Sequence, residues 1–172
     1  VMANLRTFSP RVEQYSIDEM FLDVDRVADD LNAYALQIKK QLWRHVRMPV
    51  GVGIAPSKTL SKLANHAAKQ YPATRGVVDL RDPARQRKLL DLMPVREVWG
   101  IGPRMDRHLE RMGIRTAGQL ADCDPGVMRR TFSVVIERTI PPGAIHILIL
   151  RPEPGCAKEP VDAILQFLLQ SS

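Results

Sequence analysis

The feature that most constrains this chain is an acidic pair, Asp18 and Glu19, inside the apolar run YSIDEMFLD at residues 15–23. The pattern of residues 12–24 predicts a strand, a turn and a second strand. Isolated buried carboxylates are costly, so acids in such a run usually have a partner or bind a cation. Because adjacent strand residues point to opposite faces, both carboxylates can address one site only where the chain turns or bulges. The alternative is an ordinary Asp-Glu hairpin turn with solvated side chains.

The net charge of +6 is unevenly distributed along the chain. Seven acids and a single base lie between Glu13 and Asp30, and no further acid occurs before Asp79. The acid-free interval contains eight bases, which are Lys39, Lys40, Arg44, Arg47, Lys58, Lys62, Lys69 and Arg75. An acidic site beside a basic tract suits metal ions together with a polyphosphate or a nucleic acid. A basic face that is simply solvated is the alternative.

Length and composition limit the class of protein. A chain of 172 residues with 45% apolar content corresponds to one globular domain or two small ones. No apolar run approaches the roughly 20 residues that cross a bilayer, and no signal-peptide pattern opens the sequence. Cys123 and Cys156 lack metal-ligand spacing, which predicts reduced thiols in the cytoplasm.

The first eighty residues predict a mixed α+β region. Apolar residues recur every three or four positions from Val27 to Val46, which is typical of an amphipathic helix over a sheet, and Pro49 follows it. Residues 50–54 predict a buried strand, and Ser57 is a suitable N-cap for a helix that runs to about Tyr71. Residues 76–80 predict one more short strand.

The pattern becomes helical from Asp82. Pro83 suits a helix start, residues 103–112 predict a second helix, and Thr116 and Asp124 are positioned to cap two more. We therefore place a boundary near residue 80. The last 33 residues hold five of the thirteen prolines and an apolar run at residues 145–150, which would be an aggregation hazard if exposed. Residues 161–169 predict a short apolar helix.

Three segments together resemble Y-family translesion DNA polymerases, in particular their UmuC-type members. They are YSIDEMFLD at 15–23, VGIAPSKTLSKLAN at 52–65 and VWGIGP at 98–103, and they occur in the family's order. The resemblance covers roughly residues 1–139. It implies a partial palm at residues 1–80 and a small all-helical thumb with a helix–hairpin–helix turn at 81–139. Residues 140–172 do not resemble the family.

The resemblance assigns roles to individual residues. Asp18 and Glu19 match two of the three carboxylates that hold two Mg²⁺ ions for nucleotide transfer. Lys69 matches the lysine that reaches the triphosphate, and Lys58 and Lys62 match nearby basic positions. Gly100, Ile101 and Gly102 match the DNA-contacting hairpin, and Arg104 and Arg107, in the first turns of the following helix, would add charge contacts. Without the resemblance, the lysines would suit a solvated helix face, and the glycines a turn between packed helices.

The same family implies an error-prone polymerase of the SOS damage response, acting on primer-template DNA and deoxynucleoside triphosphates. Its possible partners are a UmuD-type accessory subunit, a recombinase filament and a sliding clamp, with no membrane. The third family carboxylate precedes the fingers, and no acid lies between Val1 and Pro10. We therefore expect a fragment, carrying the second half of the palm and most of the thumb, without independent activity. The alternatives are a non-catalytic DNA-binding remnant that uses the hairpin, or a gene remnant.

Overall fold

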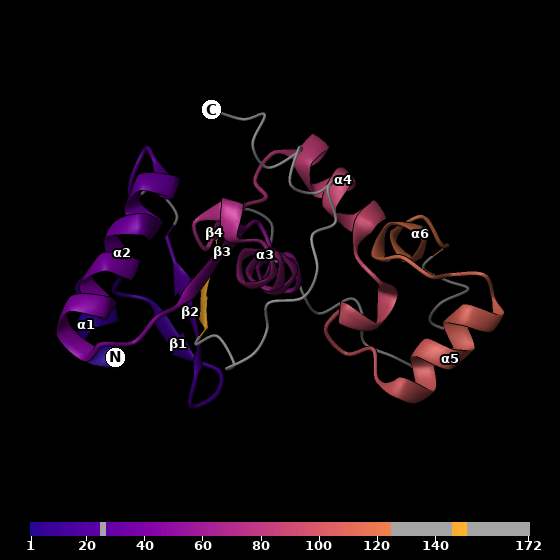
Figure 1. Ribbon diagram of the computed structural model, residues 1–172, viewed down its shortest axis with the longest axis horizontal. Coiled ribbons are helices and arrows are strands. Elements are labelled where there is room, and N and C mark those ends of the chain that lie inside the picture. Colours follow the sequence, from indigo (N-terminus) through magenta and orange to yellow (C-terminus); the bar gives the residue numbers. More distant parts are fainter. Residues whose placement is uncertain (25–26, 125–145, 151–172) are drawn as a thin grey trace. The chain divides into compact units, whose positions relative to one another are not determined.

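The computed structural model describes residues 1–24, 27–124 and 146–150. The described chain forms two compact units. The first contains the residues up to Arg81 together with a strand at residues 146–150, and the second begins at Asp82 (Figure 1). The combination of helices with a small sheet confirms the predicted α+β class.

A five-stranded sheet organises the first unit, in the order β1-β2-β5-β3-β4. The strands are β1 (Val12–Gln14), β2 (Glu19–Asp23), β3 (Gly51–Ala55), β4 (Val77–Asp79) and β5 (His146–Leu150). β3 and β4 run parallel, and the other neighbouring pairs are antiparallel. The sequence predicted the first four of these segments as strands.

β5 is the central strand of this sheet, although it comes from the C-terminal part of the chain, far in sequence from the other four strands. It pairs over five residues with β2, from Glu19 opposite Leu150 to Asp23 opposite His146. It also pairs over five residues with β3. Ile147 is fully buried. The apolar run that would be an aggregation hazard when exposed is therefore paired on both edges.

One face of the sheet carries the main hydrophobic core of the first unit. Met20 and Leu22 of β2, Val52 and Ile54 of β3, and Ile147 of β5 point to this face. The long helix α2 (Leu31–Val46) covers it with the apolar stripe Leu31, Ala35, Ile38 and Leu42, and α1 (Met2–Leu5) adds Leu5.

The helix α2 begins later than its apolar pattern suggested. Asp30 is the N-cap, and its carboxylate accepts hydrogen bonds from the backbone N–H groups of Asn32 and Ala33 at 2.9 and 3.0 Å. This capping satisfies helix donors that otherwise lack partners. Val27 therefore lies before the helix and is 38% exposed.

The other face of the sheet is covered by α3 (Lys58–Gln70), so that α2 and α3 lie on opposite sides (Figure 1). Ser57 caps α3 as predicted, since its hydroxyl accepts a hydrogen bond from the Leu60 backbone N–H at 3.2 Å. Gly53 permits close packing, because a Cβ atom there would lie 2.2 Å from the Ser61 carbonyl oxygen. The 3₁₀ turn η1 (Pro72–Thr74) connects α3 to β4.

The second unit is helical within the residues that are described. It contains α4 (Pro83–Leu92), the 3₁₀ turn η2 (Val95–Glu97), α5 (Pro103–Arg111) and α6 (Ala117–Ala121). Thr116 caps α6 in a capping box with Gln119. Val95, Leu109 and Ile114 form a small core. The helices predicted after Asp124 and at residues 161–169 lie outside the described residues.

Across the described parts of the chain, no helix is both long enough and apolar enough to span a membrane.

Candidate active site

The acidic pair lies where the β1–β2 hairpin closes. The backbone N–H groups of Tyr15 and Ser16 both donate to the Glu19 carbonyl oxygen, at 3.0 and 3.1 Å. The Ser16 hydroxyl donates to Asp18 Oδ1 at 2.6 Å and accepts from the Glu19 backbone N–H at 3.0 Å. These bonds place Asp18 in the turn and Glu19 at the first position of β2. The turn is the local departure from strand alternation that two adjacent carboxylates require to serve one site.

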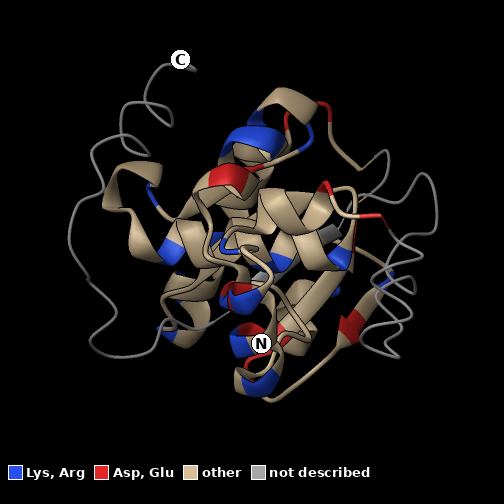
Figure 2. Ribbon diagram, turned by 90° about the vertical axis from the view of Figure 1, so that its right-hand side faces the viewer, with Lys and Arg blue, Asp and Glu red and all other residues tan. Residues whose placement is uncertain are grey.

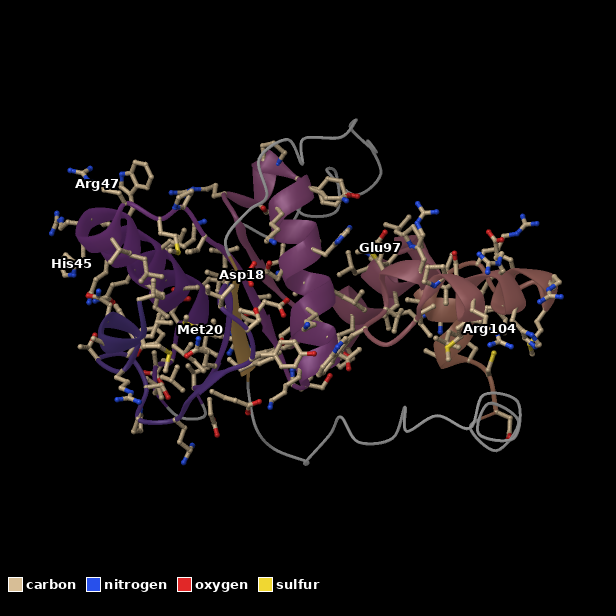
Figure 3. The ribbon with its side chains drawn as sticks, turned by 90° about the horizontal axis from the view of Figure 1, so that it is seen from below. Asp18, Met20, His45, Arg47, Glu97 and Arg104 are labelled. Atoms are coloured by element: carbon tan, nitrogen blue, oxygen red, sulfur yellow. The ribbon has the colours of Figure 1, made fainter. Side chains whose placement is uncertain are left out.

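The two carboxylates have different surroundings. Asp18 is exposed, and Figure 3 labels it in the turn that precedes β2. Its neighbour Ile17 forms the tip of the turn and is 91% exposed. The Glu19 side chain is only 18% exposed and lies on the α3 side of the sheet. The solvated-turn alternative therefore describes Asp18 but not Glu19.

A lysine from α3 pairs with Glu19. Lys62 Nζ lies 3.0 Å from Glu19 Oε2, and the Lys62 side chain is 16% exposed. The same ammonium lies 4.2 Å from the centroid of the Tyr15 ring. Attraction between a cation and an aromatic face is stronger where water is partly excluded, as it is here. Sequence reasoning placed Lys62 near phosphate but did not predict this pairing with Glu19.

The other two candidate lysines lie at the two ends of α3. Lys58, at the first turn, pairs with Glu13 of β1 at 2.5 Å and lies 5.1 Å from the centroid of the Phe21 ring. This pair is more exposed than the Glu19 pair, so it contributes little stability. Lys69 lies in the last turn, and its side chain packs over β3, where a Cβ atom at Gly51 would be 3.2 Å from Lys69 Cγ.

The described residues supply only some of the ligands that a divalent-cation site needs. Carboxylate oxygens are the ligands that Mg²⁺ prefers, and Asp18 and Glu19 supply them. However, Glu19 is already paired with Lys62, and no cluster of three potential metal-ligating side chains exists within residues 1–24, 27–124 and 146–150. The neighbouring strand offers Leu150 opposite Glu19, not a third acid. Asp23 of the same strand pairs with Arg11 at 2.8 Å.

The glycine turn of the second unit is open to its surroundings. A Cβ atom at Gly100 or Gly102 would meet no atom within 4 Å, and Gly100 has a φ of +92°. Such a backbone can approach a ligand closely. Ile101, between these two glycines, is not available to a ligand in the same way, because its side chain packs on the core of Val95, Leu109 and Ile114.

Two arginines follow this turn on the exposed side of α5. Arg104 and Arg107 are both exposed, and Arg104 is labelled in Figure 3. The basic residues of the chain are shown in blue in Figure 2. The segment before the turn is the 3₁₀ turn η2 and not an α-helix. The described structure thus brings together an open glycine turn and the basic start of a helix, the combination that binds phosphate groups in many proteins.

Comparison with known proteins identifies relatives over about four fifths of the chain. The model of the impB/mucB/samB family matches residues 1–66. Protein MucB of Escherichia coli is 49% identical over 140 residues, which are 80% of this chain and 33% of MucB. Protein UmuC of Salmonella typhimurium is 47% identical over 143 residues, covering 81% of this chain and 34% of UmuC. DNA polymerase IV of Moorella thermoacetica is 41% identical over 140 residues, covering 78% of this chain and 33% of that polymerase.

Solved structures show the same fold. The insertion ternary complex of Dbh DNA polymerase matches with a TM-score of 0.61 and 27% sequence identity, covering 75% of this chain and 37% of the other. DinB from Sulfolobus solfataricus matches with a TM-score of 0.60 and 27% identity, covering 75% and 38%. This chain spans about a third of the length of the curated relatives that it matches.

Proposed function

We propose that this chain, whose residues 1–66 match the impB/mucB/samB family, forms part of the palm and thumb of an error-prone, Y-family translesion DNA polymerase. The reaction would be transfer of a nucleotide from a deoxynucleoside triphosphate to a primer 3′ end opposite a damaged template. The observation that carries this proposal is the position of Glu19 beside the basic helix α3, one residue from the exposed Asp18.

Each part of the site has a proposed task. Asp18 and Glu19 would hold Mg²⁺, which would supply positive charge to stabilise the charge that develops during phosphoryl transfer. Lys58, Lys62 and Lys69 of α3 would face the triphosphate. The division of the chain into residues 1–80 as palm and 81–139 as thumb follows from the same proposal.

The described residues support a site that is incomplete for catalysis. They supply two carboxylates at the site, and one of them is neutralised by Lys62. Phosphoryl transfer depends on cations held against the developing charge. We therefore propose that these 172 residues by themselves do not extend a primer, and that activity requires the parts that full-length relatives possess.

A chimera tests the function independently of that incompleteness. Residues 1–139 of this chain would replace the matching segment of DNA polymerase IV of Moorella thermoacetica, and template-dependent incorporation would be measured. The proposal predicts a chimera that incorporates nucleotides and that loses this activity with Asp18→Asn or Glu19→Gln. Lys40→Met, on α2, is the matched surface control and should keep it. A folded chimera without activity, or activity indifferent to both acidic substitutions, would contradict the proposal.

A second candidate function is non-catalytic binding of duplex DNA through the hairpin at Gly100–Gly102. The open space around both glycines and the exposed Arg104 and Arg107 favour it. Gly102 has a φ of −84°, so Gly102→Leu is compatible with the fold and should weaken binding by blocking close approach. Arg104→Ala should weaken binding on all sequences and reduce the salt slope by about 1. Binding that is absent at low salt, or unchanged in both variants, would leave the hairpin a structural turn.

A further inference from the structure

The Lys62–Glu19 ion pair suggests a function for Lys62 that precedes catalysis. We propose that Lys62 is a tethered counter-cation, which neutralises Glu19 in the free protein and must leave it before a divalent cation binds there. This inference rests on the proposed function of Asp18 and Glu19 as ligands of a divalent cation. It adds that the site, in the arrangement described, is closed by a residue of the chain itself.

Both partners of the ion pair are held in place by their own elements. The Glu19 backbone is fixed by three hydrogen bonds within the β1–β2 hairpin, two to its carbonyl oxygen and one from its N–H to the Ser16 hydroxyl. Lys62 stands on the second turn of α3, and α3 is fixed against β3 by its close contact with Gly53. The contact between Nζ and Oε2 is therefore a consequence of how the hairpin and the helix pack.

The environment makes this pair stronger than a typical surface pair. Less than a fifth of either side chain is exposed, and the Tyr15 ring lies against the ammonium group. Partial exclusion of water strengthens the attraction, and it also makes an unpaired Glu19 carboxylate unfavourable. Glu19 is thus expected to have a cation beside it at all times, either Lys62 or a metal ion.

A metal ion and an ammonium group cannot share the Glu19 oxygen without repulsion. A divalent cation bound at Oε2 would place two like charges within a few ångströms in a partly desolvated site, which is costly. Lys62 would then turn outward along α3. It lies four residues from Lys58, so both ammonium groups would be on one helix face, where phosphate oxygens could accept their hydrogen bonds. Cation entry and phosphate capture would therefore favour each other through one side chain.

Lys58 does not serve the same purpose. Its partner, Glu13, lies on β1 and is not one of the two acids of the site. The Glu13 side chain is 56% exposed, so water already stabilises its charge. The closing function is assigned to Lys62 alone among the three candidate lysines of α3.

Mn²⁺ binding to the full 172-residue chain tests this inference without any measurement of catalysis. Free Mn²⁺ would be quantified by electron paramagnetic resonance for wild type, Lys62→Met, Lys62→Arg and Lys40→Met. Lys62→Met keeps the apolar stem and removes the charge, so the dissociation constant should fall by about threefold to tenfold. Lys62→Arg keeps the charge and should remain close to wild type. Lys40→Met removes the same charge from α2, on the other side of the sheet, and should also remain close to wild type.

The outcomes separate this inference from the proposed function. Circular dichroism would first establish that each variant is folded. An unchanged or weaker affinity in Lys62→Met, or an equal gain in Lys40→Met, would overturn the role of Lys62 and leave the cation site standing. Binding by Lys62→Met but not by wild type would support it in its strongest form. Two outcomes would overturn the cation site itself, and the role of Lys62 with it. One is Mn²⁺ binding that persists in every variant after Asp18→Asn and Glu19→Gln are added together. The other is the absence of Mn²⁺ binding in wild type and in all variants.

Discussion

Replacement of Gly53 by alanine should damage both the fold of the first unit and the candidate site. A Cβ atom at this position of β3 would lie 2.2 Å from the Ser61 carbonyl oxygen and 2.5 Å from the Asn65 backbone nitrogen. These are backbone atoms of α3, so no side-chain rotation can relieve the contact. The helix must move away from the sheet, and Lys62 must move with it.

The size of the effect follows from the geometry. An ordinary contact begins at 3.4 Å, so α3 has to shift by about 3.4 − 2.2 = 1.2 Å at Ser61. Overpacking of a core costs about 1–3 kcal/mol and occasionally more, and we expect about 3 kcal/mol because backbone is involved. With a urea m-value of about 1–3 kcal/mol/M, the unfolding midpoint should fall by about 1–3 M.

Gly51 provides a matched control in the same strand. A Cβ atom there would lie 3.2 Å from Lys69 Cγ, which belongs to a flexible side chain that can move aside. Alanine also lowers the backbone entropy of the unfolded chain relative to glycine, which contributes about 0.5–1 kcal/mol in the opposite direction. Gly51→Ala should therefore change the free energy of unfolding by less than about 1 kcal/mol.

The assay needs a signal from the first unit alone. The chain has two tryptophans, Trp43 in α2 and Trp99 in the second unit. In a Trp99→Phe background, fluorescence of Trp43 during urea unfolding reports on the first unit. If Gly53→Ala unfolds at the midpoint of its parent, or if Gly51→Ala is equally damaging, the close packing of α3 on β3 is refuted.

Three further predictions concern other parts of the structure. Ile147→Ala should destabilise the first unit by about 2–4 kcal/mol, because Ile147 is fully buried in the central strand. If the free energy of unfolding, followed by Trp43 fluorescence, falls by less than about 1 kcal/mol, β5 lies outside the sheet. Gly118→Ala should lower the melting temperature of the second unit, since a Cβ atom there would lie 3.1 Å from the Asp91 backbone, and an unchanged Trp99 transition would count against that packing. Asp122 has a pKa below its ordinary 3.8 because it accepts hydrogen bonds from Arg87. The advantage of wild type over Asp122→Asn should therefore be complete above pH 3.8 and disappear as the pH falls through the lowered pKa, and an advantage that persists in strong acid would contradict the pairing.

Local features of the sequence predicted much of the fold. Ser57 and Thr116 cap helices where their positions suggested, because an N-cap interaction involves only residues within one helical turn. The hairpin at residues 12–24 was predictable because its interactions are also local: the hydrogen bonds that close its turn join residues within a five-residue segment. The turn places Asp18 before β2 and Glu19 at its first position.

Long-range pairing could not be predicted in the same way. The sequence identified residues 145–150 as an apolar run, but the insertion of β5 (His146–Leu150) between β2 and β3 joins segments more than ninety residues apart. Strand pairing of this kind depends on register and on which edges remain unpaired, and neither is visible in a local pattern. The Glu19–Lys62 ion pair has the same origin, because it joins β2 to α3, two elements that lie far apart in the sequence.

We propose that Asp18 and Glu19 form a site for a divalent cation at the β1–β2 turn. Paramagnetic broadening of backbone amide resonances by Mn²⁺ tests it most directly, because the broadening falls steeply with distance from the ion. We predict that residues 15–20 and the first two turns of α3 broaden first, and that Asp18→Asn combined with Glu19→Gln abolishes the effect. Broadening centred elsewhere, or unchanged in the double variant, would contradict the claim.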